Sequence, residues 1–286
     1  MPLTDACVTL HTMIDKLALN TIRDTAAAIA RSAGALLRDA YDQPRQIDYK
    51  GTVDLVTQAD RAAEETILTA LRREFPQHAI LAEESGQIVP LTPSQDGAGL
   101  VWLIDPLDGT TNFAHAFPVF AVSIALRDAA GPLVGIIYDP LRDECFSAVR
   151  GQGAALNGEP IRVSSVDQLQ RSLLATGFPY DRHTAEDNNT AALGVFLRRA
   201  QGIRRAGAAA IDLAYVACGR LDGYWEMRLH PWDLAAGVLI VREAGGRITG
   251  YRAAAPEEEI LSGAQVVASN GLIHEEMLAA LATLYG

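Results

Sequence analysis

The segment 101–113 (VWLIDPLDGTTNF) brings two carboxylates and a carbonyl close together along the chain. Its first four residues are bulky and apolar and run into Asp105, which predicts a buried strand. Pro106 cannot donate a hydrogen bond to a neighbouring strand, so we expect the strand to end at Asp105. A sharp turn would then bring the carboxylates of Asp105 and Asp108 towards the carbonyl of Leu107. Ligand sets made only of oxygen suit hard cations such as Mg²⁺.

Gly109, Thr110 and Thr111 follow directly and could open a helical turn. The first N–H groups of a helix have no partner within it, and they lie at the positive end of its dipole, so such a turn binds phosphate. A cation site beside a phosphate-binding turn is the arrangement of a phosphoryl-transfer site. Taken alone, the segment is also ordinary turn chemistry, in which an Asp or Thr only caps a helix.

Three further acids stand at the ends of expected elements. Asp60 precedes a helix with an apolar stripe, Glu83 follows a short apolar strand, and Asp233 precedes an apolar helix that ends at a pair of glycines. Asp60 and Asp233 each have a second interpretation as helix N-caps. Glu83 also has a second interpretation, as a solvated residue at the end of a strand. The three positions by themselves therefore do not decide between these roles.

Composition excludes several classes of function. The chain has 286 residues, a net charge of −11 and 49% hydrophobic residues, which is typical of a globular protein and not of one that binds nucleic acid through a basic face. No apolar run is long enough to span a membrane, and the N-terminus lacks the pattern of a signal peptide. The three scattered cysteines make neither a disulfide framework nor a metal site. We therefore expect a cytoplasmic protein, and bound cations would offset its repulsion of an anionic substrate.

The order of expected elements predicts a layered α/β (α+β) architecture. A long helix over 17–41 precedes a polar loop over 46–53 that contains Lys50. Apolar runs over 119–150 separated by turns predict an antiparallel meander, and Asn157-Gly158 predicts a hairpin turn. We place a boundary there, between an N-terminal α+β region (1–158) that carries the metal-binding motifs and a C-terminal α/β region (159–286) that completes one compact catalytic unit.

Four motifs in order resemble those of the inositol monophosphatase family of Mg²⁺-dependent, lithium-sensitive sugar phosphatases: 54–60 (DLVTQAD), 82–86 (AEESG), 102–113 (WLIDPLDGTTNF) and 232–237 (WDLAAG). The resemblance spans nearly the whole chain. It implies the sugar-phosphatase fold, an αβαβα sandwich, and a homodimer.

The resemblance also implies two or three magnesium ions. Their ligands would be Glu83, Asp105 and the Leu107 carbonyl for the first, Asp105, Asp108 and Asp233 for the second, and Asp60 with Glu83 for a third, weaker ion. Lys50 would lie in a loop that covers the metals.

The implied catalytic residues are Asp60, Thr110 and Glu83, of which Asp60 and Thr110 would orient the attacking water. The implied phosphate and substrate contacts are Asp108, Gly109, Thr110, Thr111, Gly207, Ala209 and Glu226.

The expected activity is hydrolysis of a phosphate monoester by metal-activated water. An acid at Glu226 can accept hydrogen bonds from a polyol, which favours inositol 1-phosphate as substrate. Fructose 1,6-bisphosphate, histidinol phosphate and 3′-phosphoadenosine phosphates remain alternatives. A covalent aspartyl-phosphate is disfavoured because two residues, not one, separate Asp105 from Asp108. The alternative outside enzymes is a regulatory phosphate-binding protein with a dead site.

Overall fold

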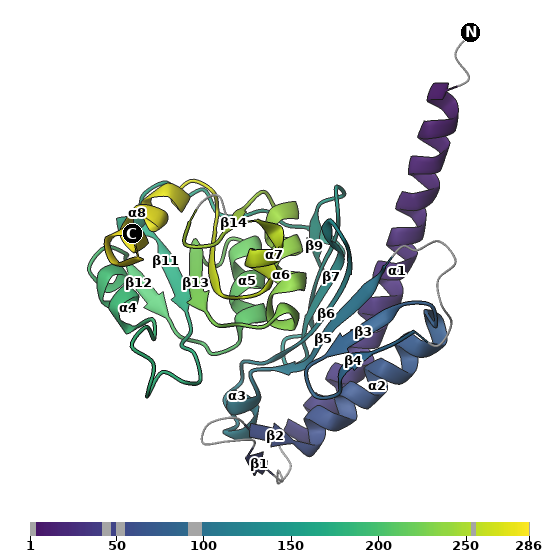
Figure 1. The fold of residues 1–286 in the computed structure, drawn as a ribbon, viewed down its shortest axis with the longest axis horizontal. Coiled ribbons are helices and arrows are strands. Elements are labelled where there is room, and N and C mark those ends of the chain that lie inside the picture. The colour runs from purple at the N-terminus through teal and green to yellow at the C-terminus, as the bar shows by residue number, and fades with distance from the viewer. Residues whose placement is uncertain (1–3, 42–46, 50–54, 91–98, 253–255, 286) are drawn as a thin grey trace.

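The chain folds into stacked layers of helices and sheets (Figure 1). The computed structural model describes residues 4–41, 47–49, 55–90, 99–252 and 256–285. Two helices, an eight-stranded sheet, a central helical layer, a five-stranded sheet and an outer helical layer follow one another. The predicted αβαβα sandwich is therefore confirmed.

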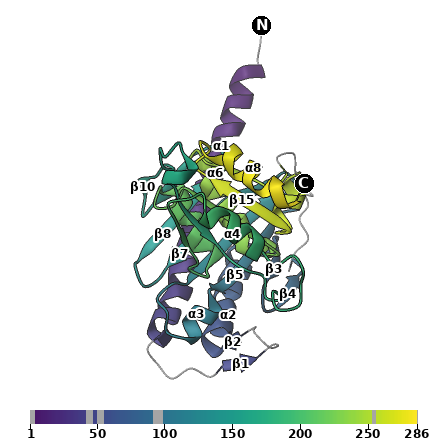
Figure 2. The same cartoon turned by 90° about the vertical axis from the view of Figure 1, so that its left-hand side faces the viewer.

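The first layer consists of α1 (Thr4–Tyr41) and α2 (Gln58–Glu74), which lie on one face of the eight-stranded sheet (Figures 1 and 2). Ala26, Ala30, Ala33 and Leu37 recur at helical spacing in α1 and are fully buried. The helix begins well before the predicted residue 17, because nothing from Thr4 onwards breaks it, and its N-terminal end extends beyond the body of the molecule.

The eight-stranded sheet has the order β10-β9-β8-β7-β6-β5-β3-β4. Its strands are β3 (Ala79–Ala82), β4 (Gly86–Ile88), β5 (Val101–Asp108), β6 (Ala121–Asp128), β7 (Gly131–Asp139), β8 (Glu144–Val149), β9 (Ala154–Leu156) and β10 (Glu159–Pro160). The predicted meander is confirmed as β6, β7 and β8. The pair β3–β5 is parallel, so the carboxyl ends of these two strands lie side by side.

The central helices α5 (Ala209–Ala217) and α6 (Pro231–Glu243) pack between the two sheets. The second sheet has the order β12-β11-β13-β15-β14 and consists of β11 (Leu173–Thr176), β12 (Gly202–Arg204), β13 (Gly223–Met227), β14 (Arg247–Thr249) and β15 (Gln265–Ser269). Its outer face is covered by α4 (Thr190–Leu197) and α8 (His274–Tyr285). Apolar side chains on both faces of this sheet explain why its strands are almost continuously buried.

Shorter elements complete the fold: β1 (Ile47–Tyr49) paired with β2 (Leu55–Thr57), α3 (Thr110–Ala114), the 3₁₀ turn Leu169–Arg171 and α7 (Glu257–Leu261). The segment predicted as a loop over 46–53 thus contains the strand β1, and Lys50 lies outside the described residues. The predicted turn Asn157-Gly158 joins β9 to β10. The division of the chain at this turn stays a prediction.

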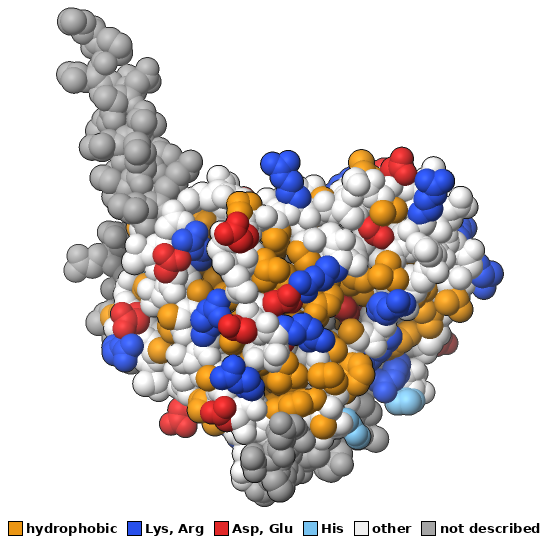
Figure 3. Space-filling view, turned by 180° about the vertical axis from the view of Figure 1, so that it is seen from behind, with side chains coloured by type: hydrophobic (Ala, Val, Ile, Leu, Met, Phe, Trp, Pro, Cys, Tyr) orange, Lys and Arg blue, Asp and Glu red, His pale blue; other side chains and the backbone are white. Residues whose placement is uncertain are grey.

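Charges of both signs are distributed over the face seen in Figure 3, with apolar side chains between them. The surplus of acid that the composition records is therefore not gathered on this face. In the part of the chain that the structure describes, no helix is both long and apolar enough to cross a membrane.

Gly135→Ala tests the contact between the first sheet and the central layer. A Cβ at Gly135 in β7 would lie 2.8 Å from the carbonyl oxygen of Ala236 in α6, so the helix would have to move away from the sheet. We expect urea denaturation to show a free energy of unfolding lower by about 1–3 kcal/mol.

Gly194→Ala is the matched control, since its Cβ would come no closer than 3.8 Å to another side chain and it lies within α4. That variant should be unchanged or more stable, by up to about 1 kcal/mol. Equal stabilities for the two variants would contradict the proposed tight packing of α6 on β7.

Candidate active site

The two aspartates of the central motif stand on either side of a bulge in β5. Contrary to the prediction, the strand does not end at Asp105 but continues to Asp108. Asp105 pairs with Ser123 and Asp108 with Ala121, so β5 has one residue more than its partner strand over this stretch. Pro106 is tolerated because the ladder is already interrupted there. The Leu107 N–H donates to Asp105 Oδ1 at 2.9 Å, which closes the expected sharp turn.

Gly109 connects this bulge to α3. Its φ of 93° is left-handed, and a Cβ there would lie 2.9 Å from the Val119 carbonyl oxygen, so both conformation and space favour glycine. Thr110 begins the helix, as predicted, and its hydroxyl donates to the Leu107 carbonyl at 3.0 Å. The N–H groups of this first turn have no acceptor inside α3.

Glu83 reaches the same place from the neighbouring strand. Its N–H donates to the Ile104 carbonyl at 3.1 Å, which continues the parallel pairing of β3 with β5 and sets Glu83 beside Asp105. Sequence reasoning missed the residue that holds this turn. The buried Glu64 accepts hydrogen bonds from the Glu84 N–H at 2.9 Å and from the Ser85 hydroxyl. Its spacing of four residues from Asp60 would have placed both acids on one face of the helix.

Asp60 is buried, with 1% of its surface exposed, in the first turn of α2. Since α2 begins at Gln58, the interpretation of Asp60 as an N-cap is wrong. The negative charge of Asp60 contributes to raising the pKa of Asp105, so it lies near the bulge of β5.

Asp233 is the third residue of α6, which begins at Pro231, so it is not the N-cap residue itself, but its side chain completes a capping box with the N-cap residue His230. Its Oδ2 accepts the His230 N–H at 2.8 Å, which leaves lone pairs on both carboxylate oxygens. Trp232 packs partly against the core, and its ring stacks on that of His230 with centroids 4.8 Å apart.

The N-terminus of α5 binds Asp108. The N–H of Ala209 donates to Asp108 Oδ1 at 3.2 Å and that of Ala210 to Oδ2 at 2.8 Å. These bonds place a buried carboxylate at the positive end of a helix dipole. They also connect the first sheet with the central layer, a link between residues about a hundred positions apart that no local pattern indicated.

These elements enclose a cavity of about 140 Å³. Of the predicted site residues, the structure brings to its lining Glu83, Asp105, Leu107, Asp108, Gly109, Thr110, Thr111, Gly207, Ala209, Glu226 and Asp233. Asp60 is not part of the lining, although its negative charge acts on Asp105. Residues that the sequence did not single out also line the cavity: Gly177, Phe178, Tyr180, Arg182, Arg205, Ala208, Leu229 and His230.

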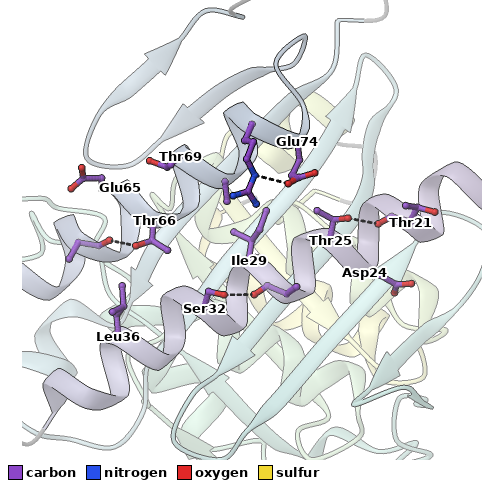
Figure 4. Close-up of a pocket in the computed structure, with 14 residues that line it drawn as sticks. Thr21, Asp24, Thr25, Ile29, Ser32, Leu36, Glu65, Thr66, Thr69 and Glu74 are labelled. Carbon is purple, nitrogen blue, oxygen red and sulfur yellow. Dashed lines mark hydrogen bonds and ion pairs between the residues drawn. The ribbon is translucent and has the colours of Figure 1, made fainter.

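A wider hollow between α1 and α2, of about 1040 Å³, lacks comparable chemistry (Figure 4). The hydroxyls of Thr25, Ser32 and Thr66 donate to the carbonyl four residues earlier in their own helices, at 2.8–3.0 Å. Its lining acids, Asp24, Glu65 and Glu74, are exposed. The smaller, carboxylate-lined cavity is therefore the candidate active site.

Three aspartic acids of this cavity bind protons more tightly than usual. Burial raises the pKa of Asp105 well above its ordinary range, and the charges of Glu83 and Asp108 raise it further. Burial and the charge of Asp233 raise the pKa of Asp108 to about 7. Burial, opposed by the His230 N–H bond and joined by the charge of Glu83, raises the pKa of Asp233 to about 8. The carboxylates are thus held together at a cost in electrostatic free energy, which a bound cation would offset.

The donor set fits a hard divalent cation, because it consists of carboxylates and one carbonyl oxygen. Among the described residues, no three acidic, histidine or cysteine side chains already converge on one point as ligands. The fit therefore rests on the chemistry and nearness of the donors, while the assignment of each ligand stays a prediction.

An αβαβα sandwich with a carboxylate-lined cavity beside a helical turn defines a class of phosphatases. The sequence profile of the inositol monophosphatase family matches residues 18–284, and the chain belongs to that family of phosphatases, which are generally magnesium-dependent. The inositol-1-monophosphatase of Synechocystis is 49% identical over 265 residues, which are 92% of this chain and 90% of that protein.

Two further relatives show the same likeness over their whole length. The Nus factor SuhB of Escherichia coli K12 is 43% identical over 263 residues, 91% of this chain and 96% of that protein. The solved structure of inositol monophosphatase from Anabaena superposes with a TM-score of 0.82 at 46% identity, over 93% of this chain and 97% of that one.

Glu64→Ala tests the link between α2 and the turn that carries Glu83. The change leaves the Glu84 N–H without its buried acceptor, so we expect a loss of about 1–3 kcal/mol in unfolding free energy and weaker binding of Mg²⁺, measured by denaturation and by calorimetric titration. Glu65→Ala, on the exposed side of the same helix, should change neither quantity. The link would be refuted by a Glu64 variant that behaves as the Glu65 variant does.

The raised pKa values predict a pH-dependent stability of the metal-free protein. Asp108 and Asp233 have folded pKa values of about 7 and about 8 against an ordinary value of 3.8, so the folded state binds more protons than the unfolded state between these limits. Their contribution to stability is present at low pH and is lost as the pH rises through the folded pKa values. In EDTA we expect Tm to fall between about pH 4 and pH 8, and Mg²⁺ to raise Tm most at the upper end.

Asp233→Asn provides the control for this titration, because an amide does not ionise. Its Tm in EDTA should fall less steeply over the same pH interval. Parallel Tm curves for the variant and the parent would show that Asp233 does not titrate there.

Proposed function

We propose that this phosphatase hydrolyses phosphate monoesters of polyols, with inositol 1-phosphate as its substrate. The observation that carries the proposal is one cavity lined by five carboxylates (Glu83, Asp105, Asp108, Glu226 and Asp233) next to the turn at Gly109. Support for the substrate comes from the Synechocystis relative, named an inositol-1-monophosphatase.

The proposed metal ligands form three sets, one for each of three magnesium ions. Glu83, Asp105 and the Leu107 carbonyl hold one magnesium ion, Asp105, Asp108 and Asp233 hold a second, and Asp60 with Glu83 help to hold a third. Bound magnesium supplies positive charge that offsets the charge of the phosphate and stabilises the oxygens that attack and leave.

The chain's own groups bind the phosphate and prepare the water. The N–H groups of Gly109, Thr110 and Thr111 point towards the phosphate oxygens. Asp60 and Thr110 orient the attacking water, with Glu83 as the third catalytic residue. The Thr110 hydroxyl donates to the Leu107 carbonyl, so its oxygen lone pairs remain able to accept a hydrogen bond from that water.

Glu226 is proposed to bind the polyol. The Tyr224 hydroxyl donates to Glu226 Oε2 at 2.5 Å, and burial raises the pKa of Glu226 to about 7, with Tyr224 and Arg205 opposing the rise. A carboxyl poised near neutrality can accept from one substrate hydroxyl or donate to another. The backbone near Gly207 and Ala209 completes this side of the site, although the Ala209 N–H already donates to Asp108.

Two expectations about the cellular form of the protein stay proposals. They are assembly as a homodimer and a location in the cytoplasm.

A substrate panel tests the proposed function. We expect phosphate release from inositol 1-phosphate that requires Mg²⁺, is lost in EDTA, and has a kcat/KM above those for histidinol phosphate and 3′-phosphoadenosine phosphates. A kcat/KM for inositol 1-phosphate far below those of the other substrates would refute the polyol assignment. No release from any of them would favour the phosphate-binding protein with a dead site.

Asp233→Asn separates the role in metal binding from folding. The variant should retain the circular dichroism spectrum of the parent yet lose activity by a factor of about 10² or more, with weaker Mg²⁺ binding. Asp24→Asn, at an exposed carboxylate on α1 paired with Arg23, should keep full activity. Near-normal turnover by the Asp233 variant would remove this residue from the site.

A further inference from the structure

We propose that Asn189 is a positioning residue for substrate recognition, which closes the loop over 177–189 and thereby holds Gly177 against the carboxylate of Glu226. The inference rests on the proposed function, because it takes Glu226 to bind a hydroxyl group of the substrate. Asn189 itself does not line the active-site cavity, so its effect on the substrate is indirect.

The loop over 177–189 connects β11 to α4 and contributes to the active-site cavity. Four of its residues line the cavity: Gly177, Phe178, Tyr180 and Arg182. The two ends of the loop lie side by side, since Asn189 Nδ2 donates to the Gly177 carbonyl at 2.7 Å. A compact surface loop whose ends meet in this way is an Ω-loop. The side chain of Asn189 therefore fixes the place where this loop leaves the second sheet.

The side-chain amide of Asn189 is buried, with 1% of the residue exposed, and its nitrogen and oxygen both have partners. Nδ2 also donates to the Thr176 hydroxyl at 2.9 Å, and Oδ1 accepts the Trp225 Nε1–H at 2.9 Å. An indole N–H can only donate and a backbone carbonyl can only accept, so this orientation of the amide is the one that suits both. The Thr176 hydroxyl donates to the Trp225 carbonyl at 2.7 Å. The network thus joins β11, β13 and the loop.

Local rules predict a different role for Asn189. It occupies the N-cap position of α4, where an asparagine side chain usually accepts an N–H of its own helix. Here it makes no capping bond, and its φ of 69° lies in the left-handed region, which costs conformational energy. Asn188 Oδ1 accepts the Thr190 N–H instead, at 3.3 Å. Such a conformation persists where the surrounding structure requires it, here the network that closes the loop.

Gly177 lies directly against the carboxylate of Glu226. A Cβ at Gly177 would collide with both carboxylate oxygens, and its φ is not in the left-handed region, so space and not conformation requires the glycine. The Tyr224 hydroxyl donates to Glu226 Oε2 at 2.5 Å. Without the bond from Asn189, Gly177 could move away and the carboxylate could turn. Hydrogen bonds from substrate hydroxyls would then weaken, because they depend on direction.

Asn189→Asp tests the proposal with a side chain of the same shape. Aspartate tolerates a positive φ and can still accept the Trp225 indole N–H, but its other oxygen has no proton to donate to the Gly177 carbonyl. The experiment compares kcat/KM for inositol 1-phosphate with kcat/KM for phenyl phosphate, which has no hydroxyl for Glu226 to bind. This ratio should fall about tenfold or more, mainly through a higher KM for inositol 1-phosphate, as expected for a lost hydrogen bond to a charged group.

Two further variants show whether Asn189 acts through Glu226. Gly177→Ala displaces the same carboxylate without removing a hydrogen bond of Asn189, so the ratio should fall as it does in Asn189→Asp. In a Glu226→Ala background, Asn189→Asp should cause no further fall in the ratio, because residues that act through one group are not additive.

Asn157→Asp is the matched control for loss of stability. Asn157 also has a positive φ, of 50°, and its Nδ2 donates to the Asp143 carbonyl at 2.8 Å. It lies at the turn between β9 and β10 and does not line the cavity. Its ratio should equal that of the parent even where its Tm is lower.

Tryptic cleavage measures the closure of the loop without any substrate. Arg182 is the one lysine or arginine in the sequence 177–189. Cleavage after Arg182 should be roughly tenfold faster in Asn189→Asp than in the parent or in Asn157→Asp, because proteolysis follows the population of the open loop and a lost buried hydrogen bond raises that population.

An Asn189→Asp variant with the ratio of the parent would overturn the role in recognition, whatever its rate of cleavage. So would an equal fall of the ratio in the Glu226→Ala background, since Asn189 would then act independently of Glu226. A parent protein that releases no phosphate from either compound would refute the proposed function. Faster cleavage of Asn189→Asp would still support closure of the loop by Asn189 in that case, and an equal rate would overturn it.

Discussion

Repulsion between buried carboxylates is the constraint that the architecture of this protein has to meet. Glu83, Asp105, Asp108 and Asp233 share one small cavity, where burial and the neighbouring charges raise the pKa of the last three. Without rigid support such side chains would turn away towards water. Backbone N–H groups provide that support, and a bound cation would offset the repulsion that remains between the carboxylates.

The support comes from different layers of the fold. The Leu107 N–H holds Asp105 within the first sheet, whereas the Ala209 and Ala210 N–H groups of the central layer hold Asp108. The His230 N–H holds Asp233 at the start of α6. The site is therefore complete only when the first sheet and the central helices are packed together, and the stability of that contact is also a condition for activity.

The residues proposed to carry out the reaction and those proposed to select the substrate lie in different parts of the same cavity. The proposed metal ligands lie on α2, directly after β3, on β5 and on α6, whereas Glu226 and the lining residues Arg182 and Arg205 come from the second sheet and its loops. Loops at a rigid site can change without disturbing the chemistry. A separation of this kind allows the substrate specificity to change while the carboxylates stay the same.

Local patterns in the sequence determined much of the fold and the acids of the site. Helical and alternating apolar periods, with the turns at Asn157-Gly158 and Gly109, predicted most elements because they depend on neighbours along the chain. The motifs of the family indicated which acids converge. Local rules were wrong where tertiary packing overrode them: β5 continues through Pro106 as a bulge, and Asp60 and Asp233 lie in the first turns of their helices and not at the N-cap position.

Only the tertiary structure decided which groups support the acids and which line the rest of the cavity. Glu64 bonds to the turn after Glu83, and α5 bonds to Asp108, across 20 and about 100 residues of chain. Arg182 and Arg205 both line the cavity, although nothing near them in the sequence marks them. A sequence reveals interactions between neighbours through periodicity, but contacts between distant residues appear only when the layers are packed, because their energy depends on distance in space and not along the chain.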